Sequence, residues 1–206
     1  MLGVARNGDW SAALASARSR ARLRTVQLMM HSVLVVLAVA LVIPCMAQTP
    51  RMPDVEAQRA AMKKLGFLIG KWSGEARRLG QAGAPVELIQ TESAEYKLDG
   101  LLLVIEGVGR TKDGGKLELQ AFGMISYDDA TSTYRMRAFN DGRWVETEVK
   151  LIDVGQGITW GISFGDIKTK SVLRINEKGE WTELTELTIG AQSPLKYMEL
   201  TVRRQK

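Results

Sequence analysis

The sequence predicts an all-β fold, a closed, antiparallel, up-and-down β-barrel of about ten strands preceded by one short helix. Beyond residue 66, β-branched and aromatic residues alternate with charged ones, and Gly, Asp or Asn interrupts this pattern about every 8 to 12 residues. The predicted connections are short, about six residues at most. Closure into a barrel hides the sheet edges, whereas a two-sheet sandwich, the alternative, normally needs longer crossovers.

Residues 1–47 are predicted to be a cleaved signal peptide with a basic n-region. An unbroken apolar run of 11 residues, 33–43, is too short to cross a bilayer, which takes about 20 residues. Small residues at Cys45 and Ala47 stand where a signal peptidase reads the chain, so we expect cleavage after Ala47. The basic n-region contains Arg6, Arg18, Arg20, Arg22 and Arg24.

The predicted leader implies a periplasmic or secreted protein with no transmembrane anchor in the mature chain. Alternatives to this interpretation are a retained anchor helix and a lipidated Cys45, although Pro44 is unusual before a lipidated cysteine. Met29 or Met30 is an alternative start of the chain.

The charge balance of the mature chain argues against nucleic acid as a partner. The whole chain has a formal charge of +5, but residues 48–206 contain 23 basic and 22 acidic residues and are nearly neutral. His31 and Cys45, the only histidine and cysteine, lie in the leader. The mature chain therefore lacks the residues for disulfides, thiol catalysis, a Ser-His-Asp triad or a typical zinc site, and we predict no metal and no cofactor.

The mature chain divides into a flexible lead-in, 48–54, and a single barrel domain, 55–206. Asp54 is the expected N-cap of a helix over 55–65. Turns at Asp99-Gly100, Asp113-Gly114-Gly115, Asp141-Gly142 and Lys178-Gly179 supply residues that adopt left-handed backbone in tight hairpins. The expected strands are 71–79, 86–97, 101–110, 116–127, 133–140, 143–152, 157–164, 167–175, 180–189 and 196–204.

The segment 65–75, with Gly70-x-Trp72 at the first strand, resembles the opening of exported bacterial DUF1579-type proteins and, more broadly, of calycins, the lipocalin group. This resemblance implies a lipocalin-like barrel in which Trp72 closes one end and a basic residue of the last strand, Arg203 or Arg204, packs over it. Related barrels bind haem through a histidine. Because the mature chain has none, we do not expect haem.

Alternation along the strands suggests which side chains line the interior. One face of strand 133–140 carries Tyr134, Met136 and Asn140, and strand 157–164 directs Trp160 with its apolar neighbours to one side. Trp144 lies near a strand end and is expected at the barrel mouth. The candidate ligand contacts are Trp72, Tyr134, Met136, Asn140, Trp144 and Trp160. These aromatics would equally fill a packed core, although ten strands leave more room than eight.

No residue is predicted to be catalytic. Glu106 in an apolar strand is the one candidate for a buried acid, but a lone Glu in a strand more often points outward. Gly107-x-Gly109 lacks the rest of a phosphate-binding pattern and is interpreted as a bend or bulge. Asp128-Asp129 is interpreted as a solvated turn, because it lacks the spacing of a calcium loop.

Three functions fit the sequence. The favoured one is an exported module that holds an apolar or amphipathic small molecule in the barrel. The second is an envelope module with a packed interior that acts through its outer surface, by binding a protein or forming a homodimer. The third is a histidine-free enzyme acting on a small hydrophobic substrate, and an enzyme is the less favoured interpretation.

Overall fold

The computed structural model describes residues 51–206 except 81, 82 and 141, and the side chain of residue 154 is also outside the description. The predicted leader, 1–47, lies outside the described residues. Among those described, no helix is long and apolar enough to span a membrane. The elements are α2 (Val55–Met62), the 3-10 helix η1 (Lys63–Leu68), β1 (Gly70–Leu79), β2 (Pro85–Lys97), η2 (Leu98–Gly100), β3 (Leu102–Thr111), β4 (Leu117–Asp128), β5 (Thr133–Asn140), β6 (Arg143–Ile152), η3 (Asp153–Gly155), β7 (Gly157–Phe164), β8 (Ile167–Ile175), β9 (Trp181–Ile189) and β10 (Leu195–Arg204).

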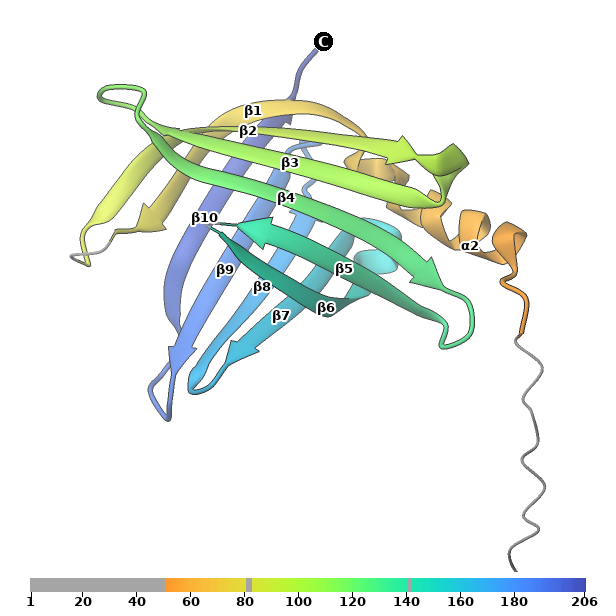
Figure 1. The fold of residues 1–206 in the computed structure, drawn as a ribbon. Helices are drawn as coiled ribbons and strands as arrows, with labels where there is room; N and C mark the ends of the chain where they lie inside the picture. Colours follow the sequence, from red (N-terminus) through yellow and green to blue (C-terminus); the bar gives the residue numbers. More distant parts are fainter. Residues whose placement is uncertain (1–50, 81–82, 141) are drawn as a thin grey trace, which may run out of the picture. The chain divides into compact units, whose positions relative to one another are not determined.

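The ten strands form a closed antiparallel barrel (Figure 1). Each strand pairs with its neighbours in the chain, and β1 closes the ring by pairing with β10. This confirms the predicted all-β, up-and-down barrel with a short helix before it. Closure removes the exposed sheet edges that a meander would otherwise leave. The hairpin turns contain the left-handed residues that the sequence indicated, among them Asp99, Gly115, Gly142 and Gly179.

The helical segment begins at Asp54, whose side chain accepts a hydrogen bond from the Ala57 amide at 3.0 Å. It leaves α-helical geometry earlier than predicted, because residues 63–68 wind as a 3-10 helix. In a 3-10 helix, residues three apart lie on the same side. The tighter winding therefore directs both Leu65 and Leu68, each fully buried, into the core.

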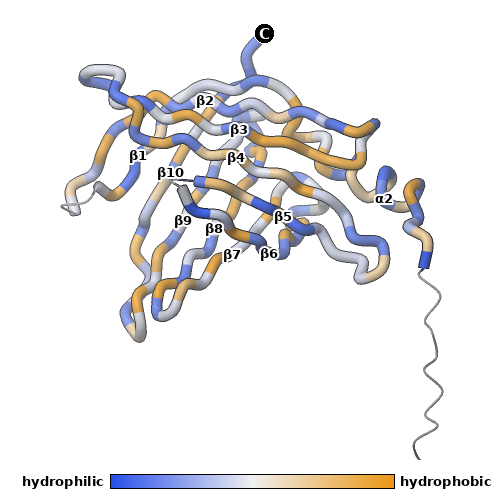
Figure 2. The backbone as a smooth tube through the Cα atoms, viewed as in Figure 1, coloured by the Kyte–Doolittle hydropathy of each residue, from blue (hydrophilic) through white to orange (hydrophobic). Residues whose placement is uncertain are grey.

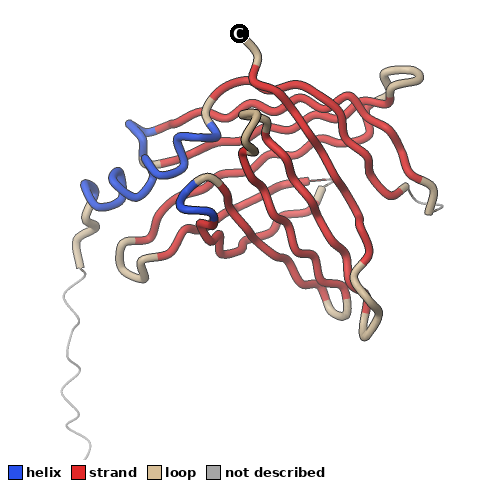
Figure 3. The backbone as a smooth tube through the Cα atoms, turned by 180° about the vertical axis from the view of Figure 1, so that it is seen from behind, coloured by secondary structure: helices blue, strands red, loops and turns tan. Residues whose placement is uncertain are grey.

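This segment covers one end of the barrel, which we call the capped end (Figure 3). Tyr96 of β2 donates to the Met62 carbonyl at 2.6 Å, and Tyr134 of β5 donates to the Ala61 carbonyl at 2.8 Å. The turn after β4 adds Asp129, which accepts hydrogen bonds from the Asp54 amide and the Gln58 side chain. Asp129 thus anchors the helix, a role that the interpretation as a solvated turn missed.

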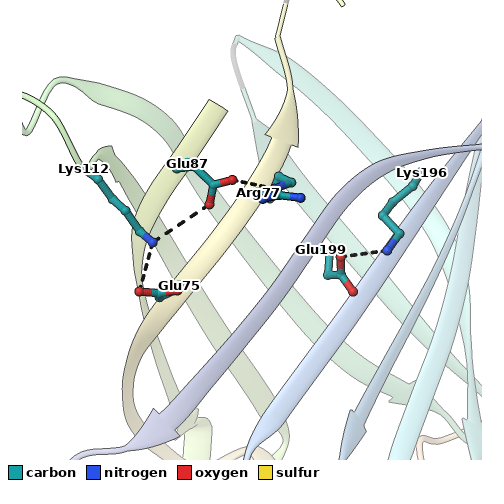
Figure 4. Close-up of polar contacts among 6 residues, drawn as sticks. All are labelled: Glu75, Arg77, Glu87, Lys112, Lys196 and Glu199. Atoms are coloured by element: carbon teal, nitrogen blue, oxygen red, sulfur yellow. Dashed lines mark hydrogen bonds and ion pairs between the residues drawn. The ribbon is translucent and has the colours of Figure 1, made fainter. Parts of the chain in front are cut away.

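Hydrophilic and hydrophobic residues alternate along the strands (Figure 2). On the outer surface of β1, β2 and β10, acidic and basic side chains form ion pairs (Figure 4). Lys112 lies 2.9 Å from Glu75, and Lys196 lies 2.8 Å from Glu199. Such exposed pairs contribute at most about 1 kcal/mol each, so the inner rows of side chains carry most of the stability.

Candidate ligand-binding site

The inward-facing side chains become more exposed from the capped end to the opposite, uncapped end. Near the capped end, Ile125, Val149 and Leu173 are buried. At the uncapped rim, side chains that pair across three strands are 48%, 42% and 41% exposed. These rim residues are Phe164, Ile167 and Ile189. Because apolar residues of the inner rows are exposed there, solvent reaches the interior from the uncapped end.

The structure places five of the six predicted contacts on inward rows, four of them along the barrel wall and Trp72 at the capped end. Met136 lies opposite the buried Ile125, and Trp160 lies opposite the buried Val149. Directly opposed residues in an antiparallel pair share a face, so both side chains point inward. Trp160 is only partly buried and therefore borders solvent-accessible space. Of the other two inward residues, Tyr134 is engaged with the helix, and Asn140 has a side-chain oxygen without a partner among the described residues.

Trp72 lies at the capped end and is 1% exposed. Its indole N–H donates to the Leu68 carbonyl at 2.9 Å, and its ring meets that of Trp181 edge-on, with centroids 5.7 Å apart. The Arg204 guanidinium lies over the Trp72 ring, 4.1 Å from its centroid, and donates to carbonyls of the helical segment. Arg203 points away and pairs with Glu180 at 2.7 Å. Arg204, not Arg203, is thus the basic residue over this tryptophan.

Trp144 lies at the uncapped end of β6 but on the outer face, which corrects the expectation that it contacts a ligand inside the barrel. It is 54% exposed and lies opposite Phe139, itself 49% exposed. Its strand neighbour Val145 opposes Ala138 on the inner face, so the alternation of β6 carries Trp144 outward. Trp144 is therefore not part of the interior surface.

The sequence interpretation missed a chain of polar side chains inside the barrel, which we call the interior polar cluster. Gln90 donates from Nε2 to Glu92 Oε1 at 2.7 Å, and the Ser171 and Thr185 hydroxyls are 2.8 Å apart. Glu183, in the inner row of β9, lies close enough to Glu92 for charge repulsion, and Thr185 lies near enough to Glu183 to lower its pKa. The cluster consists of Gln90, Glu92, Ser171, Glu183 and Thr185.

Two glycines of β3 make room for this cluster. Gly109 lies opposite Gln90, and Gly107 lies opposite Glu92. A Cβ at Gly109 would lie 2.6 Å from Gln90 Oε1, and one at Gly107 would lie 2.8 Å from Glu92 Oε2. A register shift does follow Gly109, as the bulge interpretation suggested. A Cβ at either position would displace the end of the polar side chain opposite it, so the two glycines accommodate the cluster.

The surroundings of the two carboxyl groups in the cluster raise their pKa values and so favour their protonated forms. Burial raises the pKa of Glu92 to about 8, repulsion from Glu183 adds to the effect, and the hydrogen bond from Gln90 opposes it. Burial likewise raises the pKa of Glu183 to about 7, against the influence of Trp181 and Thr185. Glu183 lies deep among the strands yet keeps partial solvent contact, so it borders internal free space.

A groove lies on the outer face of β3, β4 and β5. This groove has a volume of about 490 Å³, and its wall includes Val108, Gln120, Phe122 and Phe139. Glu106, the candidate buried acid, lies beside it and is exposed. The groove contains none of the buried polar atoms that lack partners, so the interior is the better candidate site. Within the described part of the chain, no group of three or more acidic, histidine or cysteine residues is placed to hold a metal ion.

Comparison with known proteins identifies solved structures that share this fold. No protein-family model matches the chain, and no curated protein matches it. The crystal structure of Rv2717c from M. tuberculosis matches with a TM-score of 0.54 and 12% sequence identity, over 71% of this chain and 98% of that one. The S-type phycobiliprotein lyase CPES from Guillardia theta matches with a TM-score of 0.51 and 8% identity, over 76% of this chain and 99% of that one.

The chain shares their barrel fold. At these identities the likeness concerns the fold alone. It supports the lipocalin-like part of the predicted resemblance. Membership of the narrower DUF1579-type group remains a prediction.

Proposed function

We propose that this protein is an exported module that binds an amphipathic small molecule inside its barrel. The observation that carries the proposal is the interior polar cluster, a small set of buried polar groups on a largely apolar inner surface that solvent reaches from the uncapped end. Ligand sites in proteins typically combine apolar walls with a few fixed polar groups. The export part rests on the sequence of the leader.

An enzymatic role has weaker support. A buried carboxyl with a raised pKa is a typical acid–base group, and Glu92 and Glu183 have that property. The hydroxyls of Tyr96 and Tyr134, however, donate to helix carbonyls and hold the capped end together. The geometry thus assigns these tyrosines a structural role, and binding is the simpler function.

The second candidate is an interaction through the outer surface, by binding another protein or forming a homodimer. The paired, half-exposed rings of Phe139 and Trp144 and the groove beside them favour it. The same experiment distinguishes the two surfaces, because an apolar dye reports on whichever one it binds.

Gly123 of β4 offers a way to block the interior without disturbing the backbone. It lies on the inner face opposite Ile105 and Ala138, and a Cβ there would meet no atom closer than 4.0 Å. Gly123→Phe is expected to weaken binding of an environment-sensitive apolar dye by about tenfold or more, because the new ring occupies the ligand's space. Dye fluorescence titrations measure this effect.

The matched control is Gln120→Phe, which places the same side chain on the outer face of the same strand, in the wall of the groove. We expect its dye affinity to stay within about twofold of that of the unchanged protein. If Gln120→Phe alters dye binding and Gly123→Phe does not, the outer groove is the binding surface and the proposal is wrong.

A further inference from the structure

The interior polar cluster contains hydrogen-bond acceptors that the protein leaves unused. Gln90 is fully buried, and its Oε1 has no partner among the described residues while its Nε2 is bonded to Glu92. A buried acceptor without a partner is unfavourable, because it has lost its hydrogen bonds to water and gained none from the protein. The indole N–H of Trp181, 2% exposed, also lacks a hydrogen bond of ordinary geometry, although it lies near enough to Glu183 to lower its pKa.

The two carboxyl groups also lack a neutralising cation from the protein. In the described strands around them, β1, β2, β9 and β10, the inward-facing rows bring two arginines. Arg78 is paired with Glu118 at 3.0 Å. Arg204 is engaged with the Trp72 ring and the helical segment. No ion pair among the described residues joins either arginine to Glu92 or Glu183, although the buried Nε of Arg78 has no hydrogen-bond partner there.

We infer that the cluster is a binding site for the cationic end of an amphipathic amine, in which Glu92, Glu183 and Gln90 Oε1 accept hydrogen bonds from a ligand ammonium group. An ammonium offers three donors and a positive charge, which matches a site with surplus acceptors and two carboxyls. This inference rests on the proposed function and names its ligand class.

The inner wall suits the apolar remainder of such a ligand. From the cluster toward the uncapped end, the wall presents Trp160, Ile162 and Ala138, all partly exposed on the inner face. An alkyl or aryl group lying along these residues would leave solvent, while its amine reaches the carboxyl pair. Exposed Phe164 and Ile189 extend the same apolar wall to the rim.

Binding of a cation is expected to release protons from the cluster, which a purely structural cluster would not do. The carboxyl pair holds protons in the empty barrel near neutral pH, because both groups have raised pKa values. An ammonium group favours the ionised carboxylates, so at least part of a proton is released to solvent when the amine binds. The groups that face Glu92 are Glu183 and Gln90, and those that face Glu183 are Trp181 and Thr185.

The test compares three ligands with the same ten-carbon chain, decylamine, decanol and decanoate, in displacing the apolar dye at pH 7. Decylamine is expected to bind at least about tenfold more tightly than decanol, and decanoate more weakly than either. In Glu92→Gln and in Glu183→Gln, the preference for the amine is expected to fall below about threefold, with decanol affinity nearly unchanged. Glu95→Gln, an exposed position on the same strand, is the control that keeps the preference.

Isothermal titration of decylamine in two buffers with different ionisation enthalpies measures the released protons, which are expected to decrease in Glu92→Gln. Equal affinity for decylamine and decanol in the unchanged protein overturns the amine inference and leaves an apolar interior site in place. Failure of the dye and of all three ligands to bind overturns the proposed function itself.

Discussion

Trp72→Ala is expected to lower the free energy of unfolding by about 3 to 5 kcal/mol, the range for removing a fully buried large aromatic side chain. Trp72 is 1% exposed and fills the capped end against Trp181. Its loss also leaves the Leu68 carbonyl without its donor and the Arg204 guanidinium without the ring beneath it. Urea unfolding followed by far-ultraviolet circular dichroism measures the change.

Trp144→Ala is the matched control, because it removes the same side chain from a half-exposed position on the outer face. We expect it to cost about 1 kcal/mol or less. Equal destabilisation by the two variants would mean that Trp72 does not organise the capped end. Trp72→Phe, a smaller change, is expected to give an intermediate loss and serves if the alanine variant does not fold.

The stability of the barrel is expected to fall as the pH rises from about 4.5 to about 8. Below pH 4.5, Glu92 and Glu183 are protonated in the folded and the unfolded chain, so they cause no difference. Above it, the unfolded chain releases these protons while the folded chain retains them up to pH 7 or 8, which favours unfolding. Each unit of pKa difference corresponds to about 1.4 kcal/mol, so the expected loss is on the order of several kcal/mol.

Glu92→Gln is expected to remove much of this dependence and to make the protein more stable than the unchanged chain at pH 8. The amide keeps the size of the side chain but does not have to be desolvated as an anion. Glu95→Gln, on the outer face of β2 beside Lys97, is expected to leave the profile unchanged. Thermal unfolding from pH 5 to 9 measures all three proteins. A profile in Glu92→Gln identical to that of the unchanged chain would show that this carboxyl is not buried as described.

The strands could be predicted almost to the residue because the glycine-containing turns and the alternation agree along most of the chain. The inward row of β5 was likewise predictable, since Tyr134, Met136 and Ala138 alternate with Arg135 and Arg137. The helix was predicted too long as an α-helix, because its 3-10 end depends on the packing of Leu65 and Leu68 in the core.

The interior polar cluster could not be predicted from alternation, because β2 and β9 carry polar residues on both faces. In β2, Gln90 and Glu92 alternate with Thr91 and Ser93, so hydrophobicity does not indicate which row is inward. The register with β1 shows that the row of Gln90 and Glu92 faces inward, since Glu92 lies opposite the inward-facing Trp72. The one local signal was Gly107-x-Gly109, whose missing side chains mark where another strand's polar groups approach closely.

Trp144 is the opposite case, a residue that was predicted to be part of the site but lies outside it. The alternation in β6 correctly separated it from Val145, Thr147 and Val149, the inward row. Its position near the strand end suggested the barrel mouth, but an aromatic residue on the outer row remains outside wherever it lies along the strand. Trp144 was interpreted as a ligand contact, and the register of β6 does not support that interpretation.

The most direct test of the account is native mass spectrometry of the protein purified gently from the envelope or medium of the cells that produce it. We expect a chain that begins at Gln48 and retains one small amphipathic molecule per barrel, and we expect that molecule to be lost in Gly123→Phe and retained in Gln120→Phe. A bare chain that also fails to bind the apolar dye would contradict it, and would indicate a packed barrel acting through its outer surface.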